Sequence, residues 1–165
     1  MATEDLRTRR RVAYPYFLEY RTRWSDNDQY AHMNNSIYYH LFDSIINAFL
    51  AERCGIDPAS APLIGLVLKS QCQFFRPVGF PQVLDLGMQV KNLGRSSVEY
   101  EVGVFEQGKD EPAAVGGYTH VDAVYKCISP PRYTHVFVDS KSRKSAALSA
   151  DLRGGLESVR PKSKL

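Results

Sequence analysis

Long hydrophobic runs and paired cysteines are both missing from this 165-residue sequence. No segment approaches the ~20 consecutive apolar residues that span a bilayer, and the basic start lacks the apolar stretch of a secretory signal. The three cysteines, Cys54, Cys72 and Cys127, are odd in number and form no Cys-x-x-Cys pair. They indicate neither a disulfide framework nor a zinc site, and a reducing intracellular compartment fits them best.

The motifs of several common enzyme classes are also absent. The sequence has no Gly-x-Ser-x-Gly, no His-Glu-x-x-His, no glycine-rich nucleotide loop and no Gly-Lys-Ser/Thr phosphate loop. Its histidines, at positions 32, 40, 120 and 135, lack metal-ligand spacing. We therefore expect neither a metal nor a bound cofactor.

The net charge of +3 is concentrated at the two ends of the chain. Residues 1–11 hold four arginines and two acidic residues, and residues 139–165 hold seven basic and three acidic residues. The body, residues 12–138, is net negative, which argues against a nucleic-acid-binding surface. We predict a flexible basic N-terminus (1–11), one folded domain (12–138) and a flexible tail (139–165) that is poor in large apolar groups.

Hydrophobic periodicity divides the body into one helix and several strands. Apolar residues at Ile37, Leu41, Ile45 and Phe49 predict a helix of four or five turns, which Gly55 can end. Strands are predicted at Tyr16–Trp24, Gly65–Phe75, Gln82–Asn92, Ser96–Glu106 and Pro112–Lys126, with a short edge strand at Tyr133–Val138. One strand, one long helix and an antiparallel meander form an α+β pattern, which several α+β domains share.

The segment between the first strand and the helix contains the candidate catalytic residues. Two carboxylates, Asp26 and Asp28, precede a polar turn that contains His32, Asn34 and Asn35. A carboxylate beside the exposed N–H groups of a helix start places a base or nucleophile next to an oxyanion binder, as acyl transfer requires. The same residues also suit an ordinary turn and helix N-cap, so their spacing leaves both interpretations open.

This segment resembles the signature of the hotdog-fold thioesterases of the 4-hydroxybenzoyl-CoA thioesterase type, Asp-x-Asp-x-x-Gly-His-Val-Asn-Asn-x-x-Tyr. The corresponding positions are Asp26, Asp28, Ala31, His32, Met33, Asn34, Asn35 and Tyr38. Two of them differ from the signature, because Ala31 replaces glycine, and could forbid a positive φ, and Met33 replaces a branched apolar residue. The resemblance implies a hotdog fold, in which a curled antiparallel sheet of five or six strands wraps around one long central helix.

The resemblance also implies an acyl-CoA thioesterase, which hydrolyses a CoA thioester to the free acid and CoA. Asp28 would act as nucleophile or as general base on water, and the Asn35 backbone N–H would bind the thioester oxygen. His32 would bind the turn or adjust Asp28, and Asp26 is expected to be a turn-stabilising acceptor. The alternatives are a non-catalytic acyl-CoA-binding protein and a hotdog enoyl-CoA hydratase or dehydratase, which needs Asp and His in a different spacing.

Related enzymes bind the CoA phosphates with basic residues of one hairpin, which corresponds here to Leu93-Gly94. Arg95 is therefore the first candidate for a phosphate contact, with Lys91 and Ser97 beside it. An ordinary solvated turn is the alternative.

Two further expectations concern assembly and location. Hotdog subunits pair two-fold with active sites formed by both chains, so the resemblance implies a homodimer or homotetramer. The last three residues, Ser163-Lys164-Leu165, match the peroxisomal import address, which a receptor reads. We expect the protein in the peroxisomal matrix, and an accidental tripeptide is the alternative.

Overall fold

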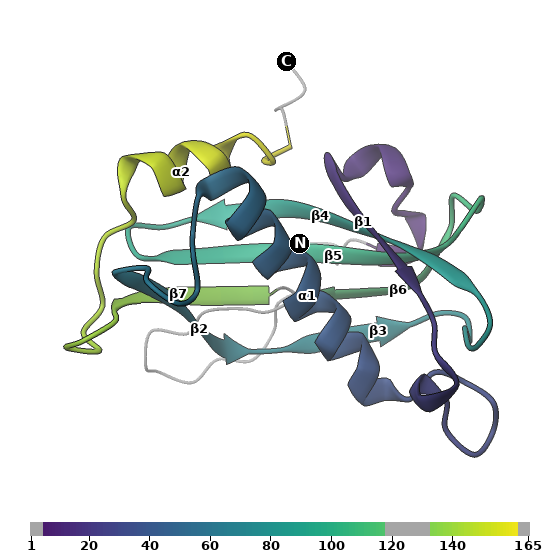
Figure 1. Cartoon of the computed structure of the whole chain (residues 1–165). Coiled ribbons are helices and arrows are strands. Elements are labelled where there is room, and N and C mark those ends of the chain that lie inside the picture. Colours follow the sequence, from purple (N-terminus) through teal and green to yellow (C-terminus); the bar gives the residue numbers. More distant parts are fainter. Residues whose placement is uncertain (1–4, 118–132, 162–165) are drawn as a thin grey trace, which may run out of the picture.

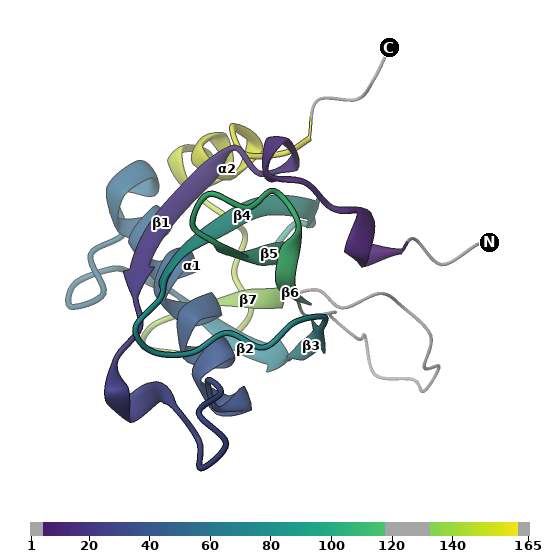
Figure 2. The same cartoon turned by 90° about the vertical axis from the view of Figure 1, so that its right-hand side faces the viewer.

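The structure, a computed structural model, describes residues 5–117 and 133–161 of the chain. In these residues a seven-stranded antiparallel sheet curls around one long helix (Figure 1), and Figure 2 shows this curvature end-on. The helices are α1 (Asn35–Cys54) and α2 (Ala150–Glu157). The strands are β1 (Tyr16–Arg21), β2 (Leu63–Lys69), β3 (Gln71–Phe74), β4 (Val83–Leu93), β5 (Ser97–Glu106), β6 (Pro112–Gly117) and β7 (Tyr133–Asp139). Short 3-10 turns lie at Leu6–Thr8, Arg11–Ala13 and Trp24–Asp26.

This is the architecture that the resemblance implies, with seven strands in place of the predicted five or six. The segment predicted as one strand, Gly65–Phe75, is divided at Ser70 into β2 and β3 after a register shift near Val67. β7 pairs with β2 on one side and with β5 on the other. The prediction of an edge strand at Tyr133–Val138 is therefore wrong, because that strand is interior.

At two positions, the sheet contains two short strands placed end to end. β6 pairs with residues 101–105 of β5, and β7 pairs with residues 97–100 of the same strand. β3 and β2 follow β6 and β7 in the same way, so together they form one edge of the sheet, and β1 forms the other. The second half of the predicted strand Pro112–Lys126 lies outside the described residues, as do His120 and Cys127.

α1 is buried against the concave face of the sheet. Its start is capped by Asn34, whose side chain accepts the Ser36 N–H at 3.0 Å, and it ends at Gly55 with a φ of 65°, as predicted. Four of its side chains are completely buried: Phe42, Ile45, Ile46 and Phe49. Gly116 of β6 lies against Phe42, and a Cβ at this position would overlap the ring. Helix and sheet can therefore approach this closely only at a glycine.

The described residues near each terminus form short elements that contact the rest of the domain. In the N-terminal turn Leu6 is buried, and the Arg9 guanidinium lies 2.7 Å from the Glu101 carboxylate. Near the other end, α2 packs on α1 and buries Leu152 and Leu156. In the described parts of these segments, a few well-placed apolar and charged groups therefore contact the rest of the domain, and the predicted flexibility of 1–11 and 139–165 stays a prediction.

Ser163, Lys164 and Leu165 lie outside the described residues. Ordered structure continues close to them, because the Val159 carbonyl accepts the backbone N–H of Val90 at 3.0 Å. Neither α1 nor α2 combines the length and the apolar character that a membrane-crossing helix needs.

Candidate active site

Asp26 is a buried part of the turn that leads into α1. It is 5% exposed, and its Oδ2 accepts hydrogen bonds from the Tyr20 hydroxyl and the Arg23 backbone N–H, both at 2.7 Å. Its carbonyl accepts the Asn34 N–H at 2.8 Å. Burial, followed by the hydrogen bond to Asp26, raises the pKa of Tyr20. Asp26 thus fixes the path of the chain, which is the turn-stabilising role expected from the sequence.

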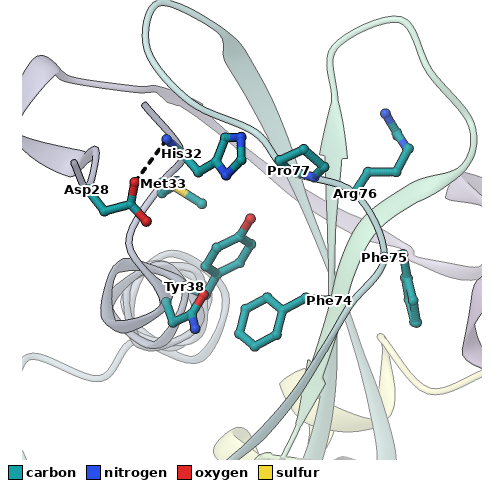
Figure 3. Close-up of a pocket in the computed structure, with 9 residues that line it drawn as sticks. Asp28, His32, Met33, Tyr38, Phe74, Phe75, Arg76 and Pro77 are labelled. Carbon is teal, nitrogen blue, oxygen red and sulfur yellow. Dashed lines mark hydrogen bonds between the residues drawn. The ribbon is translucent and has the colours of Figure 1, made fainter. Parts of the chain in front are cut away.

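Asp28 belongs to the same turn but faces a cavity. Its Oδ1 accepts the backbone N–H of Tyr30 at 2.8 Å and that of His32 at 3.2 Å (Figure 3). The backbone N–H of Asp28 in turn donates to the His32 carbonyl at 2.7 Å. No group in residues 5–117 or 133–161 donates a hydrogen bond to Oδ2. One carboxylate oxygen is therefore fixed, and the other is open to water or substrate.

Ala31 keeps the backbone conformation that the signature glycine would adopt. Its φ is 60°, in the left-handed region, so the expectation that alanine could forbid a positive φ is wrong. This conformation costs a residue with a Cβ roughly 1–2 kcal/mol, which the hydrogen bonds of the turn offset. The Ala31 carbonyl packs on Gly79, where a Cβ would come within 2.6 Å of it. The fold therefore needs glycine at position 79 and tolerates alanine at position 31.

The first turn of α1 presents one unbonded backbone N–H group close to Asp28. Among the described residues, none accepts a hydrogen bond from the N–H of Asn35, the first residue of the helix. The helix dipole adds partial positive charge at this end. An oxygen that gains negative charge would be stabilised here.

Asp28, His32 and Asn35 line one cavity of about 310 Å³ between the start of α1 and the end of β3. The three catalytic residues predicted from the sequence are therefore brought together. The cavity is further lined by Met33, Tyr38, Phe74, Phe75, Arg76 and Pro77. In Figure 3 the Tyr38 hydroxyl points toward the space between His32 and Pro77. The volume lies at the lower end of the range for small-molecule sites.

The last residue of β3 and the three residues after it form a wall of the cavity, and the sequence did not predict this. Phe74 packs edge-on against Tyr38, with ring centroids 4.9 Å apart, and the two rings make an apolar surface. Burial raises the pKa of Tyr38 to about 12, so its hydroxyl is neutral at physiological pH. Arg76 adds a cation, 3.4 Å from the Glu106 carboxylate. No local pattern marks this segment, because only the pairing of β3 with β6 brings it to the helix start.

The three residues predicted to bind CoA phosphates lie at the opposite end of the sheet from the cavity: Lys91, Arg95 and Ser97. β1, which leads to the site, ends with Arg21 paired to Val83, the first residue of β4, whereas the hairpin follows Leu93, the last (Figure 1). A strand of this length spans roughly 35 Å. Lys91 is also engaged, with Nζ 3.9 Å from the buried Glu101 carboxylate. Within one chain these residues and the cavity therefore cannot hold the two ends of one substrate.

Known proteins share both the sequence pattern and the fold. The model of the Thioesterase superfamily matches residues 30–113, so the match begins just after Asp28. The PA5185 protein from Pseudomonas aeruginosa strain PAO1 is 37% identical with a TM-score of 0.82, over 94% of this chain and 99% of that one. Slr0204, a 1,4-dihydroxy-2-naphthoyl-CoA thioesterase from Synechocystis, is 10% identical with a TM-score of 0.69, over 86% and 94% of the two chains. The Dynemicin thioesterase is 12% identical with a TM-score of 0.74, over 90% and 99%.

None of the curated proteins compared with the sequence matches it. The family match and the 37% identical structure nevertheless show that the chain belongs to the thioesterase superfamily. Its fold is the thioesterase hotdog, as the resemblance implied, and the protein is a thioester hydrolase.

Proposed function

We propose that this protein is an acyl-CoA thioesterase and that hydrolysis takes place at Asp28. The observation that carries the proposal is one cavity that contains both the open Oδ2 of Asp28 and the unbonded N–H of Asn35. A thioester carbonyl is electrophilic and its thiolate leaves readily. A carboxylate and an oxyanion binder can therefore suffice without a serine nucleophile.

Two routes use the same atoms. In the first, Oδ2 of Asp28 attacks the thioester carbon, CoA leaves as the thiolate, and water then hydrolyses the mixed anhydride. In the second, Oδ2 takes a proton from a water molecule that attacks the thioester carbon directly. In both routes the Asn35 N–H donates to the carbonyl oxygen as negative charge develops on it. The products are the free acid and CoA.

His32 has a positioning role in this proposal. Its backbone N–H holds Oδ1 of Asp28, and its carbonyl accepts the Asp28 N–H, so the two residues fix each other. This arrangement aims Oδ2 at the cavity. The rings of Tyr38 and Phe74 supply an apolar wall for the acyl group.

The alternatives have less support. A non-catalytic binding role would fit a distorted turn, but the turn accommodates Ala31 at a φ of 60° and keeps both backbone hydrogen bonds to Asp28. A hydratase or dehydratase would need an Asp and a His in a spacing that the turn lacks.

A panel of CoA thioesters tests the proposal directly. Purified protein is mixed with short, long, branched and aromatic acyl-CoA esters, and released CoA is measured with a free-thiol reagent. We expect CoA release from at least one class. Binding of the esters without release would support the non-catalytic alternative, and loss of the enoyl absorbance without release would support a hydratase.

We also propose a homodimer, or a homotetramer built from such dimers, that forms through the β2–β3 edge. Three consecutive apolar side chains of β2 are exposed: Leu66 at 38%, Val67 at 46% and Leu68 at 52%. An unpaired apolar sheet edge is a template for a second chain. Antiparallel pairing of two such edges would bring the hairpin end of one sheet toward the cavity end of the other.

Light scattering after size-exclusion chromatography at micromolar concentration is expected to give at least twice the chain mass of 18.6 kDa. Val67→Lys places a charge on the edge and should shift the protein toward the monomer. Val12→Lys is the matched control, because Val12 is 94% exposed and lies far from β2 in sequence and sheet. A monomeric parent protein would contradict the proposal.

We further propose that Ser163, Lys164 and Leu165 direct the protein to the peroxisomal matrix, where it would release CoA from fatty or branched acyl esters. The tripeptide and the basic residues before it support this proposal. Deleting Leu165 should move an N-terminally tagged protein from peroxisomes to the cytosol and leave its activity in vitro unchanged. Peroxisomal import of the truncated protein would show that another signal or a partner subunit carries it.

A further inference from the structure

A second cavity, of about 330 Å³, adjoins the cavity that contains Asp28. It is lined by Ala31, His32, Pro77, Val78, Gly79, Phe80, Pro81 and Gln82. His32 and Pro77 line both cavities, so the two meet at these side chains, and a groove that joins them would lead away from the proposed reaction centre. A CoA thioester needs such a groove, because a long pantetheine arm separates its reacting carbon from its nucleotide.

An exposed aromatic pair stands at the outer end of this groove. Phe80 lines the second cavity and is 45% exposed, and Trp24 packs against it edge-on with ring centroids 6.2 Å apart. Trp24 is 80% exposed and is the only tryptophan in the chain. Tryptophan is normally among the more buried residue types, so the hydrophobic core does not account for this position.

The two loops that present this pair are tied to each other. The Asn27 side chain accepts the Phe80 backbone N–H at 3.0 Å. The Thr22 hydroxyl lies 2.7 Å from the Gln82 carbonyl, to which it donates. Trp24 itself belongs to the short turn that the buried Asp26 closes. The aromatic surface is therefore preorganised, which reduces the entropy cost of binding.

The charge beside the pair suits phosphate. Arg21 and Arg23 both precede Trp24 in the sequence, by three residues and by one, and both are exposed. The Arg23 guanidinium lies 6.0 Å from the Tyr20 ring centroid, and Arg23 lines a third cavity, with Asp26 and Ile37, on the other side of the turn from Phe80. The neighbouring carboxylate of Asp26 is buried and already accepts two hydrogen bonds.

We propose that Trp24, Phe80, Arg21 and Arg23 bind the nucleotide end of CoA. The adenine stacks on the exposed face of Trp24, the phosphates contact the two arginines, and the pantetheine arm crosses the His32–Pro77 groove toward Asp28. In this inference the direction of the pantetheine arm, toward Asp28, rests on the proposed function. It provides a nucleotide site at the cavity end of the same chain, where the Leu93-Gly94 hairpin is too distant to serve.

The single tryptophan makes the contact directly measurable. CoA and adenosine 3′,5′-bisphosphate should both quench the fluorescence of Trp24, whereas pantetheine, which lacks the nucleotide, should not. By calorimetry, Trp24→Ala should raise the Kd of CoA about tenfold or more, which is the usual scale for a lost stacking contact. Arg23→Gln should also raise the Kd of CoA, and the rise should shrink at high salt.

Phe17→Ala is the matched control, because Phe17 is an exposed aromatic of β1 that lines neither cavity, and this variant should keep the parental Kd. Kinetics give a second readout, in which Trp24→Ala raises KM for a CoA ester with little change in kcat. The same variant should match the parent on the corresponding pantetheine ester.

Unchanged fluorescence at saturating CoA, or a parental Kd for Trp24→Ala together with a raised Kd for Arg95→Ala, would overturn the inference in favour of the hairpin. CoA quenching by a protein that hydrolyses no ester would instead leave the nucleotide site standing and reject the proposed function. The two failures are therefore distinguishable.

Discussion

Replacing Asp28 by asparagine is expected to lower kcat at least ~100-fold without unfolding the protein. Asparagine keeps the shape of aspartate, and its oxygen can still accept the backbone N–H groups of Tyr30 and His32. What it removes is the negative Oδ2, which is the atom that we propose attacks the thioester or takes a proton from water. KM should change little, because the cavity wall keeps its shape. Steady-state kinetics on the best ester of the panel, together with a thermal melt, measure both quantities.

Asp26→Asn is the matched control for this experiment. Asp26 lies two residues away, but its carboxylate is buried and bound to Tyr20 and to the Arg23 backbone, so it does not line the cavity that contains Asp28. Asp26→Asn should lose some stability, and its kcat should fall much less than that of Asp28→Asn. A near-parental rate for Asp28→Asn would reject the assigned role, and equal losses in both variants would show that the turn matters only for its structure.

The part of the candidate site that lies within one short stretch of the sequence could be predicted. Asp28, His32 and Asn35 fall within one short segment, where spacing and a family signature place a carboxylate at a helix start. The opposite wall could not be predicted in this way. Phe74 and Arg76 reach the cavity through the pairing of β3 with β6, and nothing in their own neighbourhood indicates this contact.

The predicted CoA contacts show the same limit. Lys91 and Arg95 were chosen because related enzymes use a hairpin at this point in the chain, and a one-dimensional pattern does not show which end of β4 faces the site. The register of β1 against β4 does show this, and it separates the hairpin from the cavity within one chain. By contrast, the predictions of the α+β class and of the central helix depend on periodicities that extend over many residues. A few residues that depart from the pattern do not change these predictions.

Average composition hides the few specific contacts that the described residues near the termini make. Residues 1–11 are rich in arginine and were expected to be loose, yet Arg9 reaches the convex face of the sheet and binds Glu101 through two hydrogen bonds, at 2.7 and 3.0 Å. Glu101 is 2% exposed and also accepts hydrogen bonds from Tyr14 and Gln89. Successive residues of a strand point to opposite faces, so Glu101 points away from α1 and from the cavity that contains Asp28.

Replacing Glu101 by alanine is accordingly expected to lower the free energy of unfolding by about 3–5 kcal/mol, because it removes the buried carboxylate that accepts hydrogen bonds from Arg9, Tyr14 and Gln89. For a chain of this size the melting temperature should fall by roughly 10 °C. Denaturant unfolding measures the loss, and kcat at a permissive temperature should stay close to the parental value.

Arg9→Ala and the double variant complete a thermodynamic cycle that isolates the interaction between the two side chains. Each single change already breaks the same ion pair. If the N-terminal segment is an integral part of the fold, the sum of the two single-variant losses in unfolding free energy should therefore exceed the loss in the double variant. Strictly additive losses, or a cost below about 1 kcal/mol for Glu101→Ala, would mean that the segment is held as loosely as an exposed surface ion pair. The original sequence-based expectation for residues 5–11 would then be correct.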